Sequence, residues 1–191
     1  RMAREGNCSD LPRFPVYEIK GKNLGIIGLG RIGTRIAELA LAFGAHVCYW
    51  SNNRKPEFEA KGIKYQEIDK LLSECEFISL NLALNKGTEG FLNEARTQKI
   101  KSGSVLLNLA PNELVDFIAL EKRLAKGDII YIADHTDEMS TELLKLLLRY
   151  KNCILYPPIG YQTREATALK QKIFAANMEN FLKDTPTNTV N

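Results

Sequence analysis

A glycine-rich turn between an apolar strand and an amphipathic helix constrains the fold of this chain more than any other feature. The turn has the spacing G-x-G-x-x-G, made by Gly28, Gly30 and Gly33. Residues 24–27 before it are apolar, as in a buried parallel strand, and residues 31–43 after it carry apolar side chains at helical spacing. The stretch therefore predicts a strand, a tight turn and a helix in direct succession.

Each glycine of this spacing has a physical purpose in dinucleotide binding. The first permits the tight turn, the second lets the backbone approach a diphosphate, and the third lets the helix pack closely on the strand. The helix dipole adds an attraction of roughly 0.3–2 kcal/mol for the phosphates. We expect the diphosphate to be held by Gly28, Gly30, Arg31, Ile32 and Gly33. The alternative is a glycine turn that binds nothing.

Strands and helices alternate along the rest of the chain. Further strands are expected at 45–50, 63–65, 77–84, 104–109, 129–133 and 153–156. Helices are expected at 57–61, 68–72, 92–100, 113–126, 141–149 and 163–182. This order predicts an α/β fold with a Rossmann-type doubly wound parallel sheet in three α/β/α layers. The dinucleotide-binding domain is expected at 23–182, after an N-terminal arm at 1–22 and before a linker at 183–191.

Composition and charge exclude several function classes. A formal net charge of +3 over 191 residues, with basic and acidic side chains interspersed, argues against a nucleic-acid partner. We find no apolar run long enough for a membrane span and no secretory signal at the start. The cysteines form no C-x-x-C motif, so no metal site is expected and a reducing cytoplasm fits. Cys48 and Cys153 fall in expected strands and are interpreted as small core residues.

A series of further motifs follows the glycine turn in a fixed order. Residues 79–84 read S-L-N-L-A-L and precede Thr88 and Gly90; the later motifs are L-N-L-A at 107–110, L-V-D at 114–116, A-D at 133–134, I-L-Y-P at 154–157 and T-x-E-A at 163–166. From about Glu18 to Asn191 this order resembles the D-isomer-specific 2-hydroxyacid dehydrogenases. The resemblance implies the nucleotide domain of a two-domain protein whose substrate domain is built from both chain ends. It also implies that the arm at 1–22 is an interdomain crossover that contributes to a homodimer.

The chain departs from the family pattern at the three catalytic positions. The substrate-clamping Arg of the family corresponds to Pro111, the Glu that orients the catalytic His to Met139, and that His to Pro158. Proline carries neither charge nor titratable proton, and loss of a positioned general base alone costs about 10²–10⁴ in rate. We therefore assign no catalytic residue. Two alternatives stay open, because Glu138 is one residue from the Glu position and His135 could be a displaced acid or base.

The residues after the second strand indicate which nicotinamide cofactor would fit. NAD enzymes place a carboxylate about 20 residues after the glycines, where this chain has Ser51. A hydroxyl followed by Arg54 and Lys55 suits the 2′-phosphate of NADP, so NADP is favoured over NAD. Asn52 takes the place of the Arg that stacks on adenine in NADP-using relatives.

The resemblance implies further cofactor contacts from Leu82, Ala83, Thr88, Leu109, Ala110, Asp134 and Gly160. Three functions remain open at this point. The first is a dinucleotide-binding domain that has lost hydride transfer. The second is an active oxidoreductase with atypical catalytic residues acting on a small 2-oxo or 2-hydroxy acid. The third is a structural or dimerisation module that binds no nucleotide.

Overall fold

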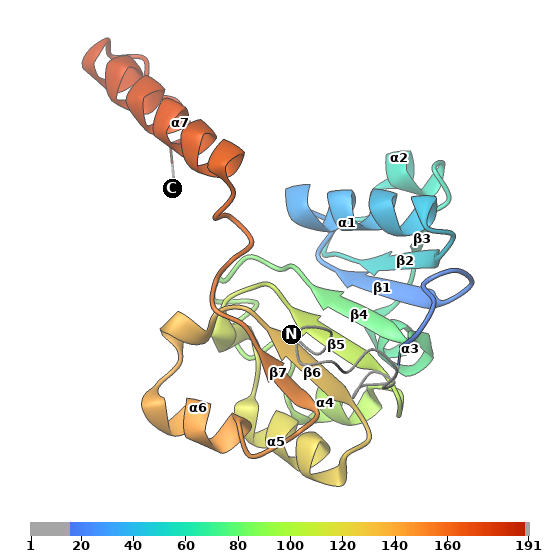
Figure 1. The fold of residues 1–191 in the computed structure, drawn as a ribbon. Helices are drawn as coiled ribbons and strands as arrows, with labels where there is room; N and C mark the ends of the chain where they lie inside the picture. The colour runs from blue at the N-terminus through green and yellow to red at the C-terminus, as the bar shows by residue number, and fades with distance from the viewer. Residues whose placement is uncertain (1–15, 190–191) are drawn as a thin grey trace, which may run out of the picture.

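A single parallel sheet organises the computed structural model, which describes residues 16–189. Its strand order is β3-β2-β1-β4-β5-β6-β7, and all neighbouring strands run parallel (Figure 1). The strands are β1 (Asn23–Ile27), β2 (His46–Trp50), β3 (Lys64–Tyr65), β4 (Phe77–Leu80), β5 (Val105–Asn108), β6 (Ile130–Ala133) and β7 (Cys153–Leu155). The predicted doubly wound parallel sheet is confirmed. Of the predicted arm at 1–22, residues 1–15 lie outside the described residues.

Helices cover the sheet from two sides. They are α1 (Arg31–Ala42), α2 (Pro56–Glu59), α3 (Ile68–Glu74), α4 (Glu94–Lys99), α5 (Phe117–Lys126), α6 (Thr141–Leu147) and α7 (Arg164–Leu182). Successive side chains of β1 point to opposite faces: Ile26 packs in the cluster with α1, and Ile27 packs in the cluster that contains α3 and α5 residues. The sheet therefore has a buried core on both faces, as the near-continuous apolar strands predict.

The helix predicted at 113–126 begins later than its apolar pattern suggests. Residues 112–114 form a short 3-10 turn, and Val115 is extended and bridges to Leu92. The Asp116 carboxylate accepts hydrogen bonds from the N–H groups of Ile118 and Ala119, so α5 starts at Phe117. Its predicted end is confirmed, because Gly127 adopts the left-handed conformation with φ 72°.

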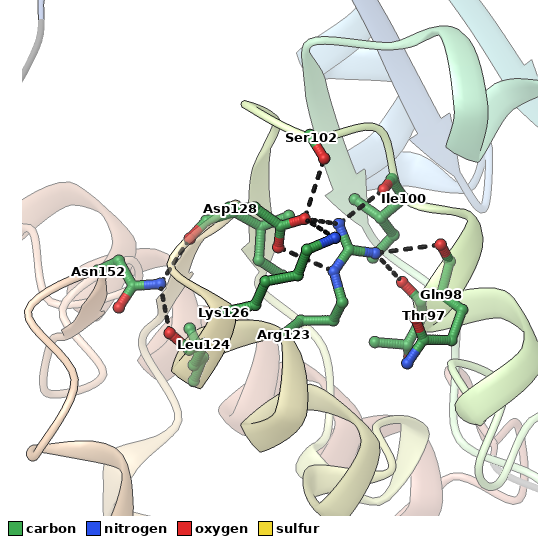
Figure 2. Close-up of polar contacts among 10 residues, drawn as sticks. Thr97, Gln98, Ile100, Ser102, Arg123, Leu124, Lys126, Asp128 and Asn152 are labelled. Atoms are coloured by element: carbon green, nitrogen blue, oxygen red, sulfur yellow. Dashed lines mark hydrogen bonds and ion pairs between the residues drawn. The ribbon is translucent and has the colours of Figure 1, made fainter.

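A buried guanidinium joins α5 to the end of α4 (Figure 2). Arg123 donates hydrogen bonds to the carbonyl oxygens of Thr97, at 2.6 Å, and Ile100, at 2.8 Å. It also pairs with the Asp128 carboxylate at 3.0 Å. Burial alone would raise the pKa of Asp128, but hydrogen bonds from Arg123, Lys126 and Ser102 outweigh it and lower that pKa to about 2. The pair holds two helices and the turn before β6 together.

The final helix, α7, extends away from the sheet (Figure 1). Its predicted N-cap is confirmed, since the Thr163 hydroxyl accepts a hydrogen bond from the Ala166 N–H at 3.1 Å. None of its 19 residues is buried. Exposed apolar side chains on it are Leu169, Ile173, Phe174, Met178, Phe181 and Leu182. Within residues 16–189 no other element covers them. The described helices include none that combines the length and apolarity needed to cross a bilayer.

Candidate functional site

A pocket of about 530 Å³ opens at the carboxyl ends of β1, β2, β4 and β5. It is lined by residues 28–32 of the glycine turn, by 51–53 and 55 after β2, by 81–83 after β4 and by 109–111 after β5. The strand order reverses between β1 and β4, and open α/β sheets bind ligands at such a reversal. The fold therefore brings four separate loops to the place where a dinucleotide would lie.

The three glycines of the turn meet different surroundings. Gly28 has φ +96°, and a Cβ there would lie 2.8 Å from the Asn81 carbonyl oxygen. A Cβ on Gly33 would lie 2.1 Å from the Gly28 carbonyl oxygen. A Cβ on Gly30 would meet nothing within 4 Å. The first and third glycines are thus required by packing, whereas the second leaves open the space that a diphosphate would enter.

The amino end of α1 faces the same pocket. Its N-cap is Gly30, which has no side chain to cap the helix, and Arg31 and Ile32 of its first turn line the pocket. The first N–H groups of a helix have no intrahelical acceptor and carry the positive end of the helix dipole. These groups and the open position at Gly30 suit a phosphate.

The loop after β2 separates its two basic side chains. The Lys55 ammonium donates a hydrogen bond of 2.6 Å to the Leu29 carbonyl oxygen and lines the pocket. Arg54 instead pairs with Glu59 at 2.6 Å and lies over the Tyr65 ring, outside the lining. Ser51 also lines the pocket, and its hydroxyl donates to the Asn53 carbonyl oxygen at 2.6 Å. Of the two basic residues of this loop that were predicted to contact the cofactor, the structure brings only Lys55 to the pocket.

The remaining predicted residues divide in the same way. Leu82, Ala83, Leu109 and Ala110 line the pocket, as do Ser51 and Asn52. Thr88, Asp134 and Gly160 do not. Thr88 is buried, with 5% of its surface exposed. Its hydroxyl is held within its own loop: it donates a hydrogen bond to the Ala83 carbonyl oxygen at 2.7 Å and accepts one from the Asn85 N–H at 2.8 Å. Asp134 and Gly160 lie near one another beyond β6 and β7, since a Cβ on Gly160 would be 3.6 Å from Asp134 Oδ2.

Buried acceptors without partners also gather at this edge of the sheet. Among the described residues, Asn81 Oδ1, Asn112 Oδ1 and Asp134 Oδ1 are buried and accept no hydrogen bond. Leaving such an atom unpaired costs about 1–3 kcal/mol, so these acceptors suit donors on a bound ligand. Leu29, Asn53, Asn81 and Pro111 also line the pocket but were not among the predicted contacts. Asn81 was expected inside the strand at 77–84, but β4 ends at Leu80, which places Asn81 at the carboxyl edge of the sheet.

The comparison with protein families bears directly on this site. The model of the D-isomer specific 2-hydroxyacid dehydrogenase NAD binding domain matches residues 1–160. The chain belongs to this family. The resemblance seen in the motifs is therefore confirmed.

Two curated members of the family illustrate how much of the protein this chain represents. It is 36% identical over 181 residues to hydroxypyruvate reductase from Blautia hydrogenotrophica, which covers 93% of this chain and 56% of the relative. It is 37% identical over 180 residues to glyoxylate reductase from Thermococcus litoralis, and this match covers 93% of this chain and 54% of the relative. The chain thus spans little more than half the length of these relatives.

Solved structures give the same proportion. D-lactate dehydrogenase from Aquifex aeolicus, complexed with NAD and lactic acid, matches with a TM-score of 0.84 and 28% identity over 96% of this chain and 60% of that one. An acyclic imino acid reductase in complex with NADPH and D-Arg matches with the same TM-score and identity, and the match covers 100% of this chain and 60% of that one. Of these two structures, the first holds NAD and the second holds NADPH.

The three residues that the motif resemblance placed at the family's catalytic positions lie in different surroundings. Pro111 lines the pocket at the start of the 3-10 turn at Asn112–Leu114. Met139 is 8% exposed and packs in the core beneath the sheet. Pro158 is half-buried in the segment between β7 and α7. None of the three side chains carries a charge or a titratable proton.

The two alternatives for a displaced acid or base lie together. His135 Nδ1 is 3.5 Å from Glu138 Oε1, and His135 Nε2 is 3.7 Å from Asp134 Oδ1. The Asn112 amide donates to the His135 carbonyl oxygen at 2.8 Å, which holds this segment against the turn after β5. The other histidine, His46, begins β2 and lines a pocket at the opposite edge of the sheet.

Proposed function

We propose that this chain binds a nicotinamide dinucleotide at the carboxyl edge of the sheet and prefers NADPH to NADH. The observation that carries the proposal is the open space at Gly30 in front of the first turn of α1, at the reversal of strand order. The preference rests on Lys55 and Ser51. A 2′-phosphate gains a charge-assisted contact from the ammonium and meets no carboxylate at Ser51.

Calorimetric titration of the purified chain with NADPH, NADH, NADP and NAD tests this proposal. We expect micromolar binding of at least one of them, with the 2′-phosphorylated forms binding more tightly. Equal affinity for NADPH and NADH would contradict the preference. No binding of any of the four would contradict the proposal as a whole and favour the structural module.

We further propose that the chain has lost the family's usual hydride-transfer machinery. Pro111, Met139 and Pro158 support this, because clamping a 2-oxo acid needs a guanidinium and its reduction needs a proton donor. The test is NADPH oxidation with glyoxylate, hydroxypyruvate and pyruvate, measured on the chain together with the sequence that flanks it naturally. We expect a flat absorbance trace. Turnover of any of these 2-oxo acids would contradict the proposal.

The contact between His135 and Glu138 favours a second candidate function, an active oxidoreductase with a relocated acid and base. A carboxylate beside one imidazole nitrogen orients the ring. If turnover is found, His135→Asn should lower it by about 10²–10⁴-fold, the contribution of a general acid or base, and Glu138→Gln should lower it less because that carboxylate only orients the ring. Glu165→Gln, on the exposed first turn of α7, is the control and should leave the rate unchanged.

We also propose that 1–22 and 183–191 connect the domain at 23–182 to a substrate domain, and that the protein is a cytoplasmic homodimer. The free thiols of Cys48, Cys75 and Cys153 support a reducing compartment.

The exposed apolar side chains of α7 support a further protein contact. Light scattering after size exclusion tests the dimer, with the double substitution Phe174→Glu and Phe181→Glu expected to weaken it if α7 contributes. A monomer at micromolar concentration would contradict the homodimer.

A further inference from the structure

A second pocket, of about 550 Å³, lies at the amino-terminal edge of β1, β2 and β3, opposite the candidate nucleotide site. Cys48 of β2 and Cys75, which follows α3, both line it. The sequence predicts Cys48 to be a core residue, but the structure places it half-buried at the wall of this pocket. Cys75 is almost fully buried. The nucleotide site uses neither thiol.

The two sulfur atoms lie 3.3 Å apart, although they are 27 residues apart in the chain. Gly25 of β1 separates their elements: it pairs in register with Cys48, and a Cβ on it would lie 3.0 Å from Cys75 Sγ. The missing side chain leaves room for the sulfurs to meet across the strand. A disulfide needs sulfurs about 2.0 Å apart, so they need to approach by only roughly 1.3 Å.

The surroundings give the two thiols different roles. The hydrogen bond with Cys48 and burial both raise the pKa of Cys75, so Cys75 stays protonated and does not react first. Cys48 is the one that a small molecule in the pocket reaches. Lys64 stands opposite Cys48 in the pairing of β2 with β3 and lines the same pocket. Its ammonium attracts a ligand that carries carboxylates.

We propose that Cys48 and Cys75 are a redox-active pair that forms a disulfide by exchange with a small, anionic peptide disulfide of the glutathione class. The Cys48 thiolate attacks one sulfur of the small disulfide, forms a mixed disulfide and releases one thiolate. The Cys75 thiol loses its proton and attacks the Cys48 sulfur, which releases the second thiolate. The two protons of the cysteines end on the two released thiols, so the protein pair is oxidised and the small disulfide is reduced.

The experiment treats the folded chain with glutathione disulfide, blocks free thiols with N-ethylmaleimide and maps tryptic peptides by mass spectrometry. Cys48 lies in the peptide 36–54 and Cys75 in the peptide 71–86. We expect these two peptides to be joined, with a loss of two hydrogen atoms and full reversal by dithiothreitol. Near-ultraviolet circular dichroism before and after treatment checks that the protein stays folded.

Three variants separate the pair from general thiol reactivity. Cys75→Ala should hold glutathione on Cys48 as a stable mixed disulfide, and Cys48→Ala should take up none at Cys75. Cys153→Ala, which removes another buried thiol, should behave like the parent chain. Glutathione that remains on Cys48 of the parent while Cys75 is alkylated would overturn the proposal. So would joining of Cys48 or Cys75 to Cys8, which lies outside the described residues, or to Cys153 in equal yield.

Discussion

The Lys55 ammonium lies 2.6 Å from the Leu29 carbonyl oxygen and joins the loop after β2 to the glycine turn after β1. The contact places a positive charge on the wall of the pocket that Ser51 also lines. The adjacent Arg54 points away and is neutralised by Glu59. Two neighbouring basic residues of the same loop are therefore expected to differ in their effect on cofactor choice.

Lys55→Met should weaken NADPH binding about tenfold, equivalent to about 1.4 kcal/mol, and change NADH binding much less. The physical reason is that only NADPH carries the 2′-phosphate. Calorimetric titration with both nucleotides measures the effect. Arg54→Met is the matched control from the same loop and should leave the NADPH to NADH ratio unchanged. A larger change of that ratio in Arg54→Met than in Lys55→Met would contradict this assignment.

Gly30→Ala and Gly33→Ala should separate binding from stability. The new methyl group at Gly30 meets open space, so the melting temperature should stay unchanged while nucleotide affinity falls at least about tenfold. The methyl group at Gly33 would lie 2.1 Å from a backbone oxygen, so that variant should lose about 1–3 kcal/mol of folding free energy. Thermal melting and titration of both variants measure the two effects. Unchanged affinity in Gly30→Ala would show that the ligand does not approach this turn.

The pairing of Asp128 with Arg123 should make stability depend on acid pH. Because the folded pKa of Asp128, about 2, lies below its ordinary value of 3.8, its contribution is complete above pH 3.8 and is lost as the pH falls through about 2. Asp128→Asn should therefore cost about 2 kcal/mol at pH 7, and its difference from the parent should shrink at pH 2–3. Urea unfolding at several pH values measures this.

The control for that series is Asp69→Asn, which breaks an exposed pair with Lys99 and should cost under about 0.5 kcal/mol. Equal losses of unfolding free energy in Asp128→Asn and Asp69→Asn would mean that the buried Arg123 network stabilises the fold no more than an exposed ion pair does. Arg123→Met should cost more than either, about 3–5 kcal/mol, because it removes the donor shared by the Thr97 and Ile100 carbonyl oxygens and leaves Asp128 with Lys126 and Ser102 alone.

The Thr88 hydroxyl should stabilise the conformation of its own loop through its two hydrogen bonds. Thr88→Val leaves the Asn85 N–H without its acceptor and should lower the free energy of unfolding by about 1–2 kcal/mol. Thr88→Ser keeps the hydroxyl and should retain most of the stability. Urea unfolding of both variants decides this, and a larger loss in Thr88→Ser than in Thr88→Val would assign the effect to the methyl group instead.

Much of the fold could be predicted because its signals are local. The spacing of Gly28, Gly30 and Gly33 and the caps at Thr163 and Gly127 act within a few residues, and all were confirmed in the structure. The start of α5 was predicted too early because the bridge between Leu92 and Val115 is a contact between distant segments. An apolar stripe alone cannot show where a tertiary contact will end a helix.

The sequence by itself determined the family, the parallel sheet and the glycine turn at its ligand edge, because backbone geometry and apolar spacing are written in consecutive residues. It also showed that the side chains of Pro111, Met139 and Pro158 cannot act as proton donors. Only the tertiary structure decided that Lys55 lines the pocket while Arg54 pairs with Glu59, and that Cys48 meets Cys75 across Gly25. These relationships depend on where side chains of different elements meet, which the packing of the whole sheet decides.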